Sequence, residues 1–168
     1  MPAGVTECDP ESRGSPSAAA FDRNPRFRTV TTVCYFAGMS VGILLITHEG
    51  IGHALVAVAT RLLSKLPLAT EAFEVPFDGD VDALLPQASA ALRRVDGGQG
   101  VLVLTDLYGA TPSNIAAKLA RLGSPVRRVS ALSLPMLLRV MNYADLELDE
   151  LPAVAAAGAR NGVIHDDA

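Results

Sequence analysis

The sequence contains no tryptophan, and phenylalanine and tyrosine together make up only 5% of its 168 residues. Because 49% of the residues are nevertheless apolar, the core must be built mainly from Ala, Val and Leu. Positive charge is also scarce, since the formal net charge is −4. A nucleic-acid-binding domain usually carries a basic patch and a high isoelectric point. We therefore expect no nucleic-acid partner.

Cysteine is nearly absent as well, which limits the possible cross-links and metal sites. The two cysteines, Cys8 and Cys34, are not arranged in a Cys-x-x-Cys spacing. This pattern favours neither a disulfide framework nor a zinc site, and a reducing cytoplasm is the expected location. No Gly-x-Gly-x-x-Gly fingerprint follows a strand-like segment, so nucleotide and flavin binding have no support. We expect neither a cofactor nor a metal.

Residues 1–38 do not have the pattern of a folded domain, and 2–28 show no sustained apolar periodicity. They are rich in Pro, Gly, Ala, Ser and charged residues, a composition that buries too little surface to offset the entropy of ordering. We interpret 1–38 as a flexible N-terminal extension or a misassigned start, with Met39 as the native start and 39–168 as one domain. An apolar run over 30–46 imitates a signal peptide or membrane span, but threonines interrupt it and its second half is needed as a strand.

From residue 39 onward, strand-like and helix-like patterns alternate. The expected strands are 41–47, a short strand within 69–76, 101–105, 128–133 and a final short strand 162–165. The expected helices are about 50–66, a helix capped by Asp80 and running to 94, 112–123, 134–143 and 148–159. This alternation predicts an α/β fold with an open, mostly parallel sheet and helices on both faces.

Two of the expected strands end in polar residues that can carry chemistry. The first ends at Thr47-His48 and the third at Thr105-Asp106, and each is followed by glycine and a helix start. In open α/β sheets, ligands collect at the carboxyl ends of strands, beside the point where the strand order reverses. If these two strands are neighbours, His48 and Asp106 face each other across that crevice.

A histidine next to a carboxylate suits phosphoryl transfer. Neutral imidazole is nucleophilic, and a carboxylate bonded to its second nitrogen fixes the tautomer and stabilises the cation formed on attack. Backbone amides at helix N-termini are ready-made anion sites. The hydroxyls of Thr111 and Ser113 can add donors there, although they can equally act as helix caps.

Three stretches of the chain resemble the mannose-type EIIA domain of the bacterial sugar phosphotransferase system. The stretches are Leu45-Ile46-Thr47-His48 with Gly50-Ile51-Gly52, Thr105-Asp106-Leu107-Tyr108-Gly109-Ala110-Thr111-Pro112, and Leu132-Ser133-Leu134-Pro135-Met136-Leu137. The resemblance covers residues 39–165 and none of 1–38. It implies four parallel strands in the order 2-1-3-4, and a short antiparallel C-terminal strand, 162–165, exchanged across a homodimer.

The resemblance also implies a function. Such a domain is a cytoplasmic phosphotransferase component with a phosphohistidine intermediate, which accepts a phosphoryl group from phospho-HPr and passes it to an EIIB partner in sugar uptake. Carried over by motif position, His48 is the phosphoacceptor, Asp106 orients it, and Gly109, Thr111 and Ser113 lie near the phosphoryl group. Membrane contact is then only indirect, through transporter subunits, and the sugar is not specified by this domain.

Two positions depart from the family pattern. Glu49 stands where a small residue commonly follows the histidine, and Ala110 stands where a second glycine is common. If the Glu49 side chain points toward His48, its negative charge raises the free energy of placing a phosphoryl dianion on the histidine. His53 is interpreted as a solvated helix residue, with a relay role as the lesser alternative. Leu107, Tyr108 and Met136 are candidates for an exposed partner contact.

Other functions remain open on the sequence alone. A regulatory phosphoacceptor without a transporter and a phosphoryl donor to a dihydroxyacetone kinase use the same chemistry. A histidine phosphatase is disfavoured because Thr47 and Glu49 flank the histidine, where phosphatases have Arg and Gly. A dimeric binding module without phosphoryl chemistry is the remaining alternative.

Overall fold

The structure, a computed structural model, describes residues 40–166. The expectations for residues 1–38 and for both cysteines therefore lie outside the described residues. Nine elements follow one another along the chain: β1 Ser40–His48, α1 Gly52–Leu63, β2 Thr70–Val75, α2 Val81–Val95, β3 Gly98–Thr105, α3 Thr111–Leu119, β4 Val126–Ser130, α4 Leu134–Met141 and α5 Leu151–Asn161.

The four strands form one parallel sheet in the order β2-β1-β3-β4, which confirms the predicted order. The central strands β1 and β3 are almost completely buried, as their unbroken apolar runs predict for strands covered on both faces. In the register between them, Ile46 pairs with Thr105, so the two strands end side by side. The strand order reverses between β1 and β3, so His48, two residues after Ile46, and Asp106, directly after Thr105, lie on either side of this point.

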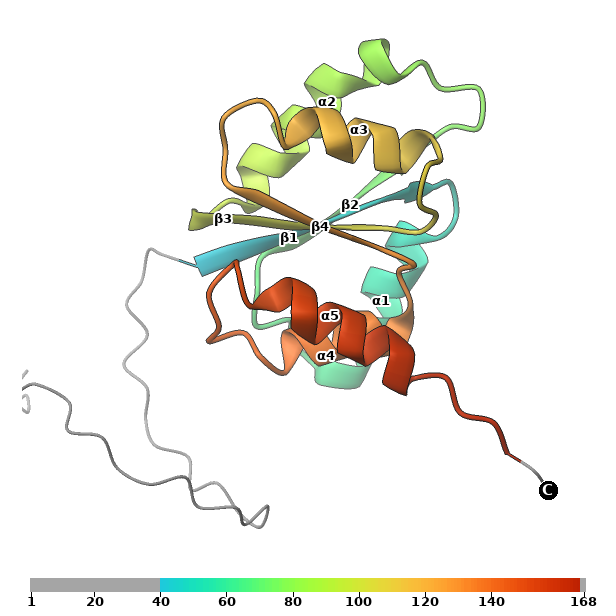
Figure 1. The fold of residues 1–168 in the computed structure, drawn as a ribbon, viewed down its shortest axis with the longest axis vertical. Coiled ribbons are helices and arrows are strands. Elements are labelled where there is room, and N and C mark those ends of the chain that lie inside the picture. The colour runs from blue at the N-terminus through green and yellow to red at the C-terminus, as the bar shows by residue number, and fades with distance from the viewer. Residues whose placement is uncertain (1–39, 167–168) are drawn as a thin grey trace, which may run out of the picture. The chain divides into compact units, whose positions relative to one another are not determined.

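Helices cover both faces of the sheet (Figure 1). Helices α2 and α3 lie on one face, and α1, α4 and α5 on the other. Alternate side chains of the central strands supply the two cores: Leu44 and Ile46 pack toward α2 and α3, whereas Ile43 and Leu45 pack toward α4 and α5. This alternation holds the sheet rigidly between two apolar layers, so the strand ends are fixed in place.

Helix α1 is shorter and packs differently from the sequence prediction. It ends at Leu63, four residues before Pro67, because Ser64 adopts a positive φ of 63°. Of the predicted apolar stripe, Ala59 is buried and Leu55 and Leu63 are partly buried, but Val58 and Leu62 are 42% and 59% exposed. The buried stripe is therefore narrower than the sequence suggested, and α1 keeps an apolar outer face.

The other boundaries follow the prediction within a few residues. Asp80 caps α2 as expected, since its side chain accepts a hydrogen bond from the backbone N–H of Asp82 at 3.1 Å, and Pro86 is accommodated inside that helix. Strand β4 begins at Val126 rather than at residue 128, and α3 ends at Leu119 rather than near 123. Helix α5 begins three residues later than the expected 148.

Residues 162–165 do not form a strand in the single chain. Gly162 closes α5, and the segment then continues without regular structure, with Val163 and Ile164 79% and 72% exposed. A strand that pairs only with a second chain has no ladder partner in an isolated one. The exchanged strand therefore stays a prediction.

None of the helices within 40–166 has the length and apolar character that crossing a membrane requires.

Candidate functional site

The carboxyl ends of β1 and β3 bring His48 and Asp106 together. Nδ1 of the His48 ring lies 2.7 Å from Oδ2 of Asp106, and the same oxygen accepts the backbone N–H of His48 at 2.8 Å. The sequence prediction that the fold pairs these two residues is confirmed. Because an ionised carboxylate only accepts hydrogen bonds, this geometry assigns the proton to Nδ1 and leaves the Nε2 lone pair available.

Asp106 is itself held in place by the start of the following loop. Its second oxygen, Oδ1, accepts the backbone N–H of Leu107 at 2.8 Å. Asp106 does not cap the following helix, since the N-cap of α3 is Ala110 and the Asp106 carboxylate contacts His48 at the end of β1. With both oxygens engaged and a side chain only 11% exposed, the carboxylate is a fixed orienting group.

The ring of His48 carries a second contact that the sequence did not reveal. Phe77, in the loop between β2 and α2, stacks on it with 5.3 Å between ring centroids and 22° between ring planes. Phe77 is 76% exposed, whereas the His48 side chain is 19% exposed. Phe77 lies two residues beyond the end of β2 and outside the strand predicted within 69–76, so no strand or helix pattern pointed to it.

Glu74 is the second residue that sequence reasoning missed. From the end of β2 its carboxylate accepts the backbone N–H of Gly50 at 3.1 Å and of His53 at 3.0 Å. These bonds, above all the one from His53, lower the pKa of Glu74 against a smaller opposing effect of burial. Two of the amides around the start of α1, those of Gly50 and His53, are therefore occupied by a protein carboxylate.

At the start of α3, by comparison, no side chain caps the helix. Its N-cap, Ala110, supplies no side-chain bond, and neither Thr111 nor Ser113 has a hydrogen-bond partner for its hydroxyl within 40–166. The capping alternative for these two hydroxyls is therefore wrong. Gly109 has a φ of +83° and open space around it, so the loop leading to α3 carries no side chain there. Within 40–166, no carboxylate accepts from the backbone N–H groups at the start of α3, in contrast to the start of α1.

The third sequence motif supports the end of β3. The backbone N–H of Leu132 donates to the carbonyl of Thr105 at 3.0 Å, and the buried Thr105 hydroxyl lies 2.8 Å from that of Ser130. The segment after β4 thus fixes the residue immediately before Asp106. This segment supports the site from within the core. Met136 is not the exposed partner contact that we expected, because it is 0% exposed and belongs to the core.

The remaining candidates lie around the site at the surface. Glu49 is exposed, and Leu107 and Tyr108 are 61% and 83% exposed, as an exposed contact requires. His53 is solvated as expected, with a side chain 69% exposed, and its Nδ1 lies 3.2 Å from Oε1 of Glu74.

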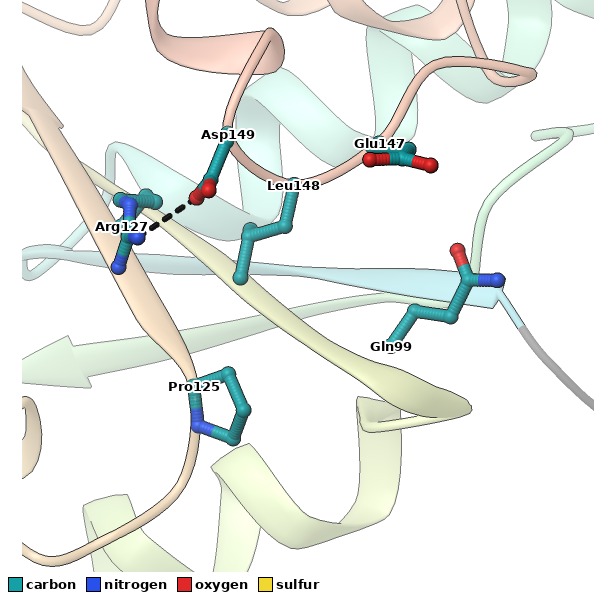
Figure 2. Close-up of a pocket in the computed structure, with 6 residues that line it drawn as sticks. All are labelled: Gln99, Pro125, Arg127, Glu147, Leu148 and Asp149. Carbon is teal, nitrogen blue, oxygen red and sulfur yellow. Dashed lines mark ion pairs between the residues drawn. The ribbon is translucent and has the colours of Figure 1, made fainter.

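A separate hollow of about 340 Å³ lies near the amino-terminal ends of β3 and β4, whereas His48 and Asp106 lie at carboxyl ends of strands (Figure 2). It is lined by Gln99 and Pro125 near the starts of β3 and β4 and by 147–149 between α4 and α5. Arg127 and Asp149 form an ion pair across it at 2.6 Å. None of the predicted site residues lines it. In the described residues no three His, Cys, Asp or Glu side chains gather as a metal site.

Comparison with known families identifies one match. The family model EIIA-man, described as "PTS system fructose IIA component", matches residues 42–156. The match begins within β1 and ends within α5, so it includes every residue of the site described above.

Two curated relatives differ in what their names say. The "PTS system mannose-specific EIIAB component" of Escherichia coli strain K12 is 28% identical over 127 residues, which is 74% of this chain and 39% of the relative. The "Transcriptional regulatory protein LevR" of Bacillus subtilis is 30% identical over 112 residues, 64% of this chain and 12% of the relative. The chain thus spans well under half the length of either relative.

Solved structures share the fold. The "Mannose/sorbose specific IIA subunit of phosphotransferase system from Enterococcus faecalis" superposes with a TM-score of 0.68 at 23% identity, covering 77% of this chain and 97% of the other. A "sigma-54 interaction domain protein" from the same organism superposes with a TM-score of 0.63 at 16% identity, covering 75% and 95%. At such identities these likenesses show the fold alone.

Proposed function

We propose that this chain, which belongs to the mannose-type EIIA family of the sugar phosphotransferase system, carries a phosphoryl group on Nε2 of His48. Family membership supports a phosphotransferase component in general, and the geometry of the site supports this residue and this atom. The observation that carries the proposal is the 2.7 Å contact of His48 Nδ1 with Asp106, which leaves Nε2 as the nucleophile.

The proposed step transfers one phosphoryl group between two nitrogens. The Nε2 lone pair attacks phosphorus, the P–N bond of the donor phosphohistidine breaks, and the donor nitrogen keeps the bonding electron pair. The proton on Nδ1 stays in place, so the His48 ring becomes cationic while Asp106 remains a carboxylate. Catalysis of this kind rests on positioning and electrostatic stabilisation. In the second transfer, the recipient's nucleophile attacks phosphorus, the P–N bond at His48 breaks, and Nε2 of His48 keeps the bonding electron pair.

The phosphoryl oxygens would lie toward the start of α3. Glu74 occupies the amides of α1, and its negative charge repels a dianion there. The α3 start offers free backbone N–H groups and the hydroxyls of Thr111 and Ser113, with Gly109 leaving room for close approach. These three residues are the proposed phosphoryl-binding group.

Phospho-HPr is the proposed donor and an EIIB protein or domain the proposed recipient. The E. coli relative is named an EIIAB component, which places both partners of the second transfer in one protein there. For this chain the exposed Leu107 and Tyr108 beside Asp106 are the proposed contact for both partners, because each must approach Nε2 from solvent.

A regulatory role is the second candidate. The similarity to LevR, named a transcriptional regulatory protein, favours it specifically. In this role the same phosphohistidine alters the activity of another protein instead of feeding transport.

The proposal is tested by intact-mass measurement after incubation with phosphoenolpyruvate, enzyme I and HPr at neutral or alkaline pH, because phosphohistidine is acid-labile. We expect one added phosphoryl group in the wild type and none in His48→Ala. Asp106→Asn should slow the uptake of the phosphoryl group roughly ten- to a hundredfold, which corresponds to the usual free energy of a hydrogen bond to a charged group. Asp145→Asn, at an exposed position away from the site, is the matched control.

Two results would contradict the proposal. Folded wild-type protein that gains no mass, while a known carrier in the same mixture is labelled, would exclude phosphoryl acceptance. A phosphoryl group that persists in His48→Ala would place the acceptor elsewhere. If the wild type is labelled, adding a candidate EIIB and following the loss of label separates transfer from a purely regulatory role.

A further inference from the structure

Phe77 occupies an unusual position for a large apolar side chain. Its ring is 76% exposed, yet it stacks on the one imidazole at the site. Only five residues connect β2 to α2, and they form a tight turn in which the backbone N–H of Gly79 donates to the carbonyl of Pro76 at 2.9 Å. The turn is anchored at one end by the buried Val75 and at the other by Asp80, the cap of α2. The backbone thus holds Phe77 at the strand ends.

The near-parallel stack constrains His48 without blocking it. Planes 22° apart mean that Phe77 covers a face of the imidazole, whereas the Nε2 lone pair lies in the ring plane and points past the edge. Asp106 fixes the opposite edge of the ring through Nδ1. Rotation of the imidazole breaks both contacts, so together they hold Nε2 in one direction.

The stack also responds to charge. The face of an aromatic ring carries negative partial charge and attracts cations. Under the proposed function, His48 becomes cationic when Nε2 gains a phosphoryl group and Nδ1 keeps its proton. Phe77 therefore binds the phosphorylated ring more strongly than the neutral one, and it does so from a direction that Asp106 does not cover.

We propose that Phe77 is a positioning residue for the phosphoryl transfer, which acts through the His48 ring by fixing its orientation and favouring its charged, phosphorylated form. This inference rests on the proposed function of His48. It gives the β2–α2 loop a part in the reaction. The His48 ring at the end of β1 is held by Asp106, which follows β3, and by Phe77 from this loop.

The test compares Phe77→Leu with Phe77→Tyr. Leucine keeps the apolar bulk and removes the π face, whereas tyrosine keeps the aromatic ring. In NMR spectra of the unphosphorylated protein, the ring protons of His48 should move downfield in Phe77→Leu, because the ring-current shielding is lost, and stay near the wild-type position in Phe77→Tyr. The control Tyr143→Leu removes an aromatic ring that instead stacks with Arg139.

Kinetics then separate positioning from docking. In phosphoryl uptake from phospho-HPr, Phe77→Leu should lower kcat roughly two- to tenfold with KM little changed, and Phe77→Tyr should restore it. A rise in KM at constant kcat would overturn the proposal and make Phe77 a docking contact. Unchanged His48 resonances in Phe77→Leu would also overturn it. A wild type that takes up no phosphoryl group defeats the proposed function instead, because the NMR comparison needs no donor.

Discussion

At the scale of single residues, the site depends on which groups already have partners. Asp106 engages one nitrogen of His48 and frees the other, and Glu74 closes the start of α1 while the start of α3 stays open. Two carboxylates at the carboxyl ends of different strands, Asp106 after β3 and Glu74 of β2, therefore have opposite effects on an incoming phosphoryl group. One stabilises the cation formed on His48, and the other excludes the anion from a competing helix start.

Glu74 makes stability depend on pH in a defined direction. Its pKa in the folded protein lies below the usual 4.5, so the ionised side chain stabilises the fold above the unfolded pKa, and this contribution is lost as pH falls through the folded value. Glu74→Gln should cost about 1 kcal/mol at neutral pH, the usual contribution of a carboxylate at a helix N-terminus. The difference between the two proteins should shrink toward zero in acid.

Urea unfolding of both proteins at neutral pH and at several acidic pH values measures this difference. Glu49→Gln is the control, since Glu49 is an exposed carboxylate to which the described residues offer no partner. A deficit of Glu74→Gln that stays constant from neutral pH into acid would show that the charge of Glu74 does not contribute.

At the scale of elements, two glycines, one within β3 and one before β4, are required for different reasons. Gly100 and Gly123 both have positive φ, 85° and 99°, and both lie away from His48. They differ in their surroundings: a Cβ at Gly100 would lie 2.5 Å from the Pro125 carbonyl oxygen, whereas a Cβ at Gly123 has open space. Gly100 thus marks close packing of β3 against the loop before β4, and Gly123 marks a conformational requirement alone.

This pair predicts two distinct stability losses. Gly123→Ala should cost about 1–2 kcal/mol, the penalty of an L-residue in the left-handed region. Gly100→Ala should cost roughly 1–3 kcal/mol more, because the new methyl group also displaces the neighbouring backbone. Chemical unfolding monitored by circular dichroism gives both values. Equal losses in the two variants would show that the chain near Pro125 relaxes freely.

At the scale of the whole molecule, the sheet leaves two edges. Strands β2 and β4 each have one neighbour in the sheet of the described chain, and the segment after α5 has no regular structure, with Val163 and Ile164 exposed. An exposed strand edge is a template for pairing with another chain. This arrangement is compatible with the predicted homodimer, in which 162–165 would pair with a second copy.

The dimer prediction is tested by sedimentation. The wild type should sediment as a dimer, and Val163→Asp with Ile164→Asp should shift it to a monomer, because two charges replace apolar side chains at the proposed interface. Val58→Asp with Leu62→Asp, which alters the exposed face of α1, is the matched control. A monomeric wild type, or a dimer that only the α1 variant disrupts, would show that the C-terminal segment does not hold the dimer.

The sequence by itself determined the order of the nine elements in 40–166 and, within one residue, the carboxyl ends of β1 and β3. Apolar runs bounded by glycine and polar residues are local features, and β1 and β3 follow directly from them. The three motifs were sufficient to place His48 and Asp106 at strand ends and to give the strand order by resemblance. Helix ends were less accurate, since Ser64 ends α1 through backbone conformation before Pro67 is reached.

Only the tertiary structure decided which groups around the histidine are engaged and which are free. The stack of Phe77 on His48, the closure of the α1 start by Glu74 and the burial of Met136 join residues from different strands and loops. Such contacts depend on directions of side chains across the sheet, which no local pattern encodes. The sequence named the reacting pair because each member ends its own strand, but the surroundings that orient the pair exist only after the strands have come together.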